Sequence, residues 1–414
     1  MPAQDNQRPL GESFRASLNL LGTRRFGIFW VATLLSNMGT WAQLVAEPWL
    51  LLTIGASSFL LGVDAFAAGA PVFILTLLGG ILADRRDRRR IITLFQSIQM
   101  LCPATLVVLL LTGMVQAWMV IALSLVVGIT DALSMPSFQS IVPSIVARDQ
   151  IAPALALNAS QFNLSRILGP AVAGALMSAV GAVGCFALNA ASYIPFIGVA
   201  LWILPRRGAL VAARDRSDRP QLLAGIRTIA RDTMLRDALL TVFLSSLLCG
   251  PLITFAPVLV KLSFERDVGS FSLAVASFGI GGLLGAVGLL GIDPRQDRWP
   301  LCSGFAAAFG AVVALTALDP WFWALPVLLM LAGFAMAVSN TCGNTLLQAT
   351  APERLRGRTV SLYMLAMRGG HSLGGLLTGA SVHVLGVRSA LLINGVLAVA
   401  LQISIRRRWL GAAG

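Results

Sequence analysis

The sequence predicts an all-α membrane protein with twelve transmembrane helices in two six-helix halves. Of its 414 residues, 57% are hydrophobic and 12% are charged, whereas soluble domains carry about 25% charged residues. The apolar residues form long runs, each near the ~20 residues that a helix needs to cross a bilayer. The longest polar gap, residues 205–237, leaves six runs on either side.

Each run ends at charged residues or at glycine and proline, which interrupt helices. The ends near Pro143 and Pro352 are the least sharply defined. The expected helices cover about 26–54, 58–82, 91–112, 118–144, 154–179, 185–204, 238–261, 269–291, 300–318, 322–350, 360–385 and 389–405.

These runs divide the chain into five segments. They are an N-terminal segment 1–25, a first half 26–204, a central loop 205–237, a second half 238–405 and a tail 406–414. Apolar residues recur at helical spacing toward the end of the central loop. This spacing predicts an amphipathic helix on the inner face of the membrane.

The distribution of Lys and Arg predicts the orientation. The gaps on the side of both termini hold 26 of the 31 Lys and Arg residues, the gaps on the other side hold three, and Arg166 and Arg368 lie inside expected helices. Short loops rich in these residues stay in the cytoplasm. We therefore expect a multi-pass protein of the cell (inner) membrane, surrounded by the lipid bilayer, with both termini cytoplasmic.

Composition argues against several other functions. The net charge of +13 comes from the loop pattern and not from a patch that binds nucleic acid. The single lysine, Lys261, precedes Leu262, so the chain lacks the Gly-Lys-Ser/Thr loop that binds ATP phosphates. Two histidines and five cysteines in apolar runs lack the spacing of a metal site. We expect no cofactor, no metal, no nucleic acid, no enzymatic activity and a monomeric state.

The loop between the second and third expected helices has the spacing Gly-x-x-x-Asp-Arg-x-x-Arg-Arg. It holds seven charges in a short turn, which has to stay in water because arginine is costly inside a bilayer. The residues at the motif positions are Gly80, Asp84, Arg85, Arg88, Arg89 and Arg90.

A second motif lies in the fifth expected helix, where Gly169 and Pro170 are followed by Gly174. These motifs and the stretches SNMGTWAQLVAEPWLLL and VPSIVARDQIAPALALNASQFNLSRILGPAVAGAL resemble the major facilitator superfamily, in particular its bacterial exporters of drugs and siderophores. The resemblance implies a secondary transporter, in which the loop motif controls the exchange between conformations and the Gly-Pro motif accompanies antiport.

The chain departs from this pattern in the fourth expected helix. The exporters often carry Asp-x-Pro-x-Arg there, whereas this chain has Ser134, Met135 and Pro136, with Asp131 one turn earlier. The resemblance therefore assigns no coupling role to this stretch.

Several ionisable residues lie inside expected helices. Such residues are costly in a membrane and mark a functional site by default. They are Glu47, Asp64, Asp131, Arg166, Arg368 and His371.

Asp131 lies near the middle of the fourth helix, and Arg166 lies about as deep in the fifth. We expect the two side chains to pair. The pair is either linked to substrate or protons, or it is a structural salt bridge.

Glu47 precedes Pro48, which opens a polar notch in the first helix. A carboxyl group in apolar surroundings favours its neutral form, so Glu47 is the first candidate for a proton carrier and Asp131 the second. A charge at the outer rim is the alternative for Glu47. Asp64 lies nearer a helix end, as a gate or rim charge does.

Arg368 and His371 lie one turn apart and either bind an anionic group or relay protons, unless His371 is structural. Trp41, with Asn37 and Gln43 nearby, is the aromatic candidate for the substrate cavity. We expect proton-coupled efflux of a small amphipathic molecule by alternating access. The alternatives are an importer or uniporter of a small solute, and a receptor or scaffold that transports nothing.

Overall fold

The computed structural model describes residues 19–204, 232–289, 298–351 and 356–413, and these ranges contain helices and connections but no strand. Most of the expected N-terminal segment lies outside the described residues. The same holds for the expected amphipathic helix of the central loop.

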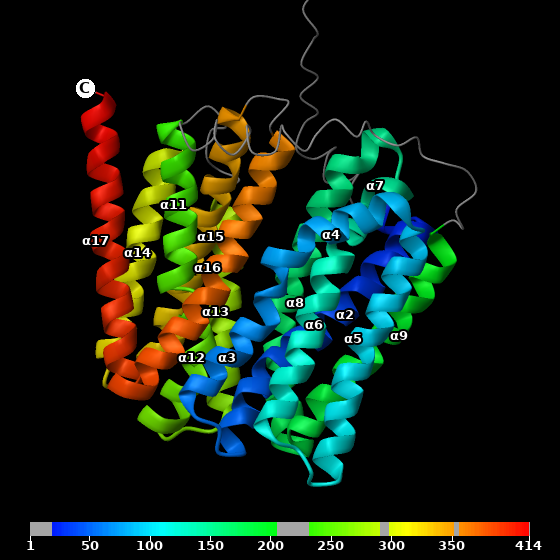
Figure 1. Cartoon of the computed structure of the whole chain (residues 1–414), viewed down its shortest axis with the longest axis horizontal. Coiled ribbons are helices and arrows are strands. Elements are labelled where there is room, and N and C mark those ends of the chain that lie inside the picture. Colours follow the sequence, from blue (N-terminus) through cyan, green and yellow to red (C-terminus); the bar gives the residue numbers. More distant parts are fainter. Residues whose placement is uncertain (1–18, 205–231, 290–297, 352–355, 414) are drawn as a thin grey trace, which may run out of the picture.

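Helices up to residue 204 gather in a first bundle (blue to green in Figure 1). It consists of α2 (Arg24–Thr53), α3 (Ser58–Gly69), α4 (Pro71–Arg85), α5 (Arg88–Leu111), α6 (Ala117–Gln139), α7 (Ile141–Ile145), a 3₁₀ turn (Arg148–Gln150), α8 (Ile151–Val180) and α9 (Ala182–Ile203).

Helices from residue 233 onward gather in a second bundle (green to red in Figure 1). It consists of α11 (Thr233–Leu248), α12 (Pro251–Val258), a π-helical turn (Leu259–Ser263), α13 (Val268–Gly288), α14 (Trp299–Leu318), α15 (Ala324–Thr350), α16 (Arg356–Leu385) and α17 (Val387–Ala413).

Every expected helix has a counterpart among these elements, but three are interrupted. The expected helix 118–144 breaks at Ser140, between α6 and α7. The expected helix 58–82 breaks at Ala70, and the expected helix 238–261 breaks at Gly250. Pro71 and Pro251 follow directly at the first position of the next helix. Proline cannot donate the backbone hydrogen bond that would continue the preceding helix.

Nine stretches of the described residues are long and apolar enough to cross a membrane. Helices α2, α8 and α16 are not among them. These are the helices that carry Glu47, Arg166 and Arg368. The polar residues of these helices include those of the candidate site.

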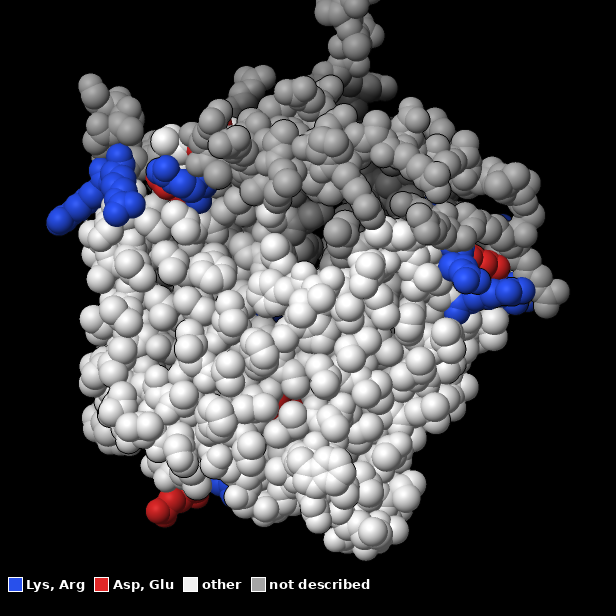
Figure 2. All heavy atoms as spheres, viewed as in Figure 1, with Lys and Arg blue, Asp and Glu red and all other residues white. Residues whose placement is uncertain are grey.

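Most of the charged side chains visible in Figure 2 lie at one end of the molecule, beyond a broad uncharged belt, and a few lie at the opposite end. We call the first of these the arginine-rich end, and it carries Arg24, Arg86, Arg88, Arg236 and Arg406. At the opposite end, four connections turn at glycines with positive φ, a conformation that glycine adopts without a steric penalty. They are Gly55, Gly113, Gly181 and Gly386.

The two bundles are joined along α3 and α16, and along α8 and α13. Small residues allow both contacts. A Cβ atom on Gly62 of α3 would lie 2.6 Å from the carbonyl oxygen of Gly375 on α16. A Cβ atom on Gly174 of α8 would lie 2.9 Å from Cβ of Ser272 on α13. Close backbone approach of this kind holds helices together within membranes.

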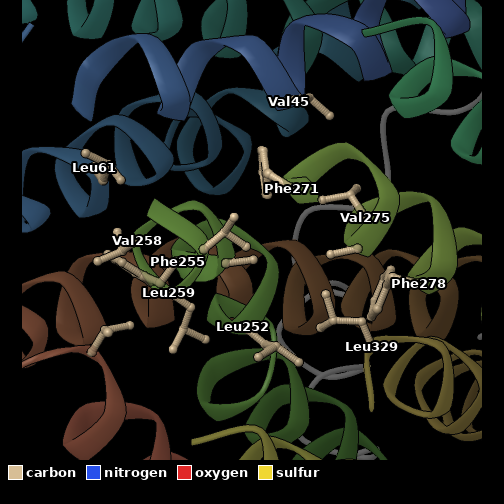
Figure 3. Close-up of a cluster of buried hydrophobic side chains, with 14 of the residues drawn as sticks. Val45, Leu61, Leu252, Phe255, Val258, Leu259, Phe271, Val275, Phe278 and Leu329 are labelled. Atoms are coloured by element: carbon tan, nitrogen blue, oxygen red, sulfur yellow. The ribbon is translucent and has the colours of Figure 1, made fainter. Parts of the chain in front are cut away.

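Near the end opposite the arginine-rich end, apolar side chains of both bundles pack in one cluster (Figure 3). Val45 and Leu61 of the first bundle pack in one cluster with Phe255 and Phe271 of the second. The Trp49 ring stacks on Phe271 with 5.9 Å between centroids. The described structure is therefore closed between the bundles at this end.

Candidate functional site

Asp131 and Arg368 form an ion pair between the bundles. Arg368 Nη1, on α16, lies 2.6 Å from Asp131 Oδ2, on α6, and their side chains are 32% and 43% exposed. Both residues lie well inside their helices. Because they belong to different bundles, the pair exists only while the bundles approach one another at this depth.

The expected pairing of Asp131 with Arg166 is wrong. Sequence order suggested that the helices carrying them are neighbours, but α6 packs on α3, α4 and α5, while α8 packs on α2, α9 and α13. Asp131 therefore pairs with the second bundle.

Arg166 lies between two aromatic rings, one from each bundle. Its guanidinium carbon is 5.5 Å from the centroid of the Trp41 ring on α2 and 5.6 Å from that of Phe278 on α13. Both distances are typical of cation–π interactions. Trp41 also packs edge-on against Phe162 of α8, with 6.0 Å between centroids.

Glu47 and Asp64 lie together near the side chain of Ser124. The Ser124 hydroxyl donates a hydrogen bond to Glu47 Oε1, and Asp64 lies within electrostatic range of Glu47 and within reach of the same hydroxyl. Asp64 Oδ1 is buried and forms no hydrogen bond with any described residue. The structure thus places Asp64 beside Glu47 and not at an exposed rim.

Amide side chains extend this polar group through the first bundle. Gln43 Nε2 donates to Glu47 Oε2 over 2.9 Å, and Gln43 Oε1 accepts from Asn189 Nδ2 over 2.5 Å. Asn37 Nδ2 donates to Gln161 Oε1 over 3.4 Å. Gln43 is therefore fixed from both sides and orients one oxygen of Glu47.

The Gly-Pro motif of α8 has a packing role beside Trp41. A Cβ atom on Gly169 would overlap Cβ of Trp41, so glycine lets α8 approach α2 closely. Pro170 lies inside the helix, and Gly174 contacts Ser272 of the second bundle. The motif brings Arg166, one turn before Gly169, up to the Trp41 ring.

His371 lies one turn beyond Arg368 on α16. A Cβ atom on Gly250 would lie 2.5 Å from Nδ1 of His371. The imidazole of His371 therefore packs against the break between α11 and α12.

The loop motif joins α4 and α5. Asp87 caps α5 by accepting a hydrogen bond from the Arg89 backbone over 3.0 Å, and Arg89 Nη1 donates to the Leu204 carbonyl over 3.4 Å. The side chains of Asp84 and Arg85 lie outside the described structure. A Cβ atom on Gly80 would meet open space.

Sequence reasoning missed several residues of the site. Ser124 lies seven residues before Asp131, which places both on one face of α6, and that spacing was a usable signal. No sequence signal marked Phe278 and Asn189, because their contacts with Arg166 and Gln43 depend on which helices pack together. Gly79, rather than its neighbour Gly80, carries the close contact, because its Cβ would lie 2.6 Å from the Ala132 carbonyl oxygen.

Among the described residues, no group of three or more His, Cys, Asp and Glu side chains could hold a metal ion. The five cysteines are buried and form no disulfide.

The sequence is similar to families and proteins of membrane export. The profile of a family described as "Transmembrane secretion effector" matches residues 16–410. The multidrug efflux pump Tap of Mycolicibacterium fortuitum is 25% identical over 373 residues, which cover 87% of this chain and 90% of Tap. The enterobactin exporter EntS of Shigella boydii serotype 4 is 26% identical over 422 residues, with 96% of each chain covered.

Solved structures share the fold. The nucleoside transporter NupG has a TM-score of 0.74 at 14% identity and covers 94% of this chain and 99% of its own. A bacterial homologue of the lysosomal transporter Spinster, in an inward-facing and occupied conformation, has a TM-score of 0.72 at 17% identity, with 92% and 96% covered. The profile match and the shared fold together show that this chain is a membrane transporter of the major facilitator superfamily and belongs to its family of transmembrane secretion effectors.

Proposed function

We propose that the protein exports a small amphipathic molecule across the inner membrane in exchange for protons, as a monomer, with the arginine-rich end in the cytoplasm. The printed names of its relatives, a multidrug efflux pump and an enterobactin exporter, support cargo of this kind. The excess of Lys and Arg at the arginine-rich end supports the orientation.

The observation that carries proton coupling is the carboxyl pair of Glu47 and Asp64. Two carboxylates that share a site away from water repel one another, so ionisation of both at once is costly. Ser124 and Gln43 supply hydrogen bonds to Glu47, whereas no described residue supplies one to Asp64 Oδ1. In this proposal Glu47 is the proton carrier, and Asp64 is the group that makes full ionisation of the pair costly.

Alternating access follows from the contacts between the bundles. The apolar cluster of Figure 3 closes the opposite end, and the pair of Asp131 and Arg368 joins the bundles at mid-depth. We propose that segments 26–204 and 238–405 rock against one another, while segments 1–25, 205–237 and 406–414 stay in the cytoplasm. Export requires that the apolar cluster open and the ion pair break in each cycle.

Transport in proteoliposomes tests the proposal. A fluorescent amphipathic probe is followed with and without an imposed pH gradient, and proton movement is followed with an internal pH indicator. Glu47→Gln should abolish gradient-driven transport and keep exchange of the probe at equal pH. Glu265→Gln, an exposed carboxyl near the opposite end, is the matched control and should transport normally.

Two results would contradict the proposal. Gradient-driven transport that survives Glu47→Gln and Asp64→Asn unchanged would remove the pair as the coupling site. Wild-type protein that moves no probe under either gradient direction would favour a receptor or scaffold.

A further inference from the structure

One charged group in the core of the described helices forms no ion pair with a described side chain. Asp131 pairs with Arg368, and Glu47 is bound by Ser124 and Gln43. Among the described side chains no carboxylate forms a salt bridge with Arg166, although it lies midway along α8. A guanidinium at this depth without a countercharge is costly, so a ligand that supplies the countercharge would be stabilised there.

Arg166 is held in position by aromatic rings and not by a counterion. Trp41 and Phe278 cover the guanidinium at 5.5 and 5.6 Å, and each belongs to a different bundle. A Cβ atom on Gly282 would lie 3.5 Å from both terminal nitrogens. Glycine at this position therefore leaves ordinary contact space beside the two terminal nitrogens, which carry N–H donors.

A guanidinium offers two kinds of surface. Its faces stack on aromatic rings, and its edge binds a carboxylate with two parallel hydrogen bonds. Here two aromatic rings pack beside the guanidinium, and its N–H donors are the groups that would recognise an acidic ligand. An aromatic body on the ligand would find Trp41 and Phe278 within contact range.

We propose that Arg166, Trp41 and Phe278 form the cargo site and select an amphipathic anion, an aromatic or apolar molecule that carries a carboxylate or a similar acidic group. The proposal rests on the proposed export function and names its class of cargo. An anion bound at Arg166 forms the ion pair that no described carboxylate forms with it. Because Trp41 and Phe278 come from different bundles, such a ligand bridges the bundles.

Binding of three matched probes to purified protein in detergent tests this site. The probes are 1-pyrenebutyrate, 1-pyrenebutanol and 1-pyrenebutylamine, which share one aromatic body and differ in charge. Wild-type protein should bind the carboxylate at least about tenfold more tightly than the alcohol, as a charge-assisted pair of hydrogen bonds implies, and should bind the amine most weakly.

Arg166→Gln should abolish the preference for the carboxylate and keep the affinity for the alcohol within about threefold. Arg166→Lys should keep some of the preference, because it keeps the charge and loses the two-pronged geometry. This second variant also covers the case in which glutamine impairs folding. Arg266→Gln is the matched control. Arg266 is an exposed arginine with the same kind of contact, 5.5 Å from the Phe322 ring, and its loss should leave all three affinities unchanged.

Equal binding of the three probes, a preference for the amine, a failure of 1-pyrenebutyrate to bind, or a preference that survives Arg166→Gln would each overturn the proposal. These outcomes are separable from the test of export, because they need no gradient. Gradient-driven transport without charge preference would keep the export function and remove the anion site. Charge preference without transport would keep the anion site and remove the export function.

Discussion

Asp131→Asn removes the carboxylate that joins α6 to Arg368 across the two bundles. The pair is close, with 2.6 Å between Nη1 and Oδ2, but its side chains are 32% and 43% exposed. Exposed pairs contribute about 0.2–1 kcal/mol and the loss of one partner of a buried pair costs about 3–5 kcal/mol. For this half-exposed pair we expect about 1–2 kcal/mol.

That energy stabilises the conformation in which the bundles meet at mid-depth. Its loss should therefore shift the conformational equilibrium away from the described state by about 5- to 30-fold. Spin labels at Met114 and Trp321 report the shift as a change in their distance distribution. Both residues are exposed, at 62% and 73%, near the opposite end of different bundles, and the five native cysteines are buried.

A double-mutant cycle separates the ion pair from other effects. Arg368→Gln should shift the equilibrium as Asp131→Asn does, the double variant should shift it little further, and exchanging the two residues should restore the original distribution. Single variants whose effects add without coupling, or that leave the distances unchanged, would refute the reasoning.

Three further predictions concern packing, the loop motif and topology. Gly62→Val should weaken closure at the opposite end, because the carbonyl oxygen of Gly375 leaves no room for a side chain. The distances between the same spin labels should lengthen. Gly198→Val, at a position in open space, is the control and should leave the distances unchanged. Asp84→Asn should slow transport strongly and leave equilibrium binding of the probe within a few-fold; loss of binding by a folded variant would contradict a purely conformational role. In sealed cells, an impermeant thiol reagent should label Met114→Cys and should not label a cysteine at position 407; the reverse pattern would invert the topology.

Helix positions could be predicted from the sequence because each depends on a local run of apolar residues. The breaks at Ala70 and Gly250 were also readable in principle, since Pro71 and Pro251 mark them. Helices α2, α8 and α16 were found by reading runs between charges, although their hydropathy alone does not set them apart as spans.

The partners of the buried charges could not be predicted in the same way. Asp131 and Arg368 are 237 positions apart, and only the packing of α6 near the second bundle joins them. The proximity of Glu47 to Asp64 likewise depends on how α2, α3 and α6 pack against one another. Periodicity within one helix does not specify that packing. The contact between Gln43 and Glu47 could be predicted from the sequence, because residues four positions apart lie on one face of a helix.

The glycine turns of the opposite end have a mechanical consequence. Gly55, Gly113, Gly181 and Gly386 each lie in a turn of a few residues that joins one helix to the next, so four pairs of consecutive helices form hairpins at that end. A hairpin whose tips are tied cannot splay there. Any opening at that end must therefore separate whole hairpins from each other, along the seams between α3 and α16 and between α8 and α13. Under the proposed export, the cargo would leave between intact hairpins.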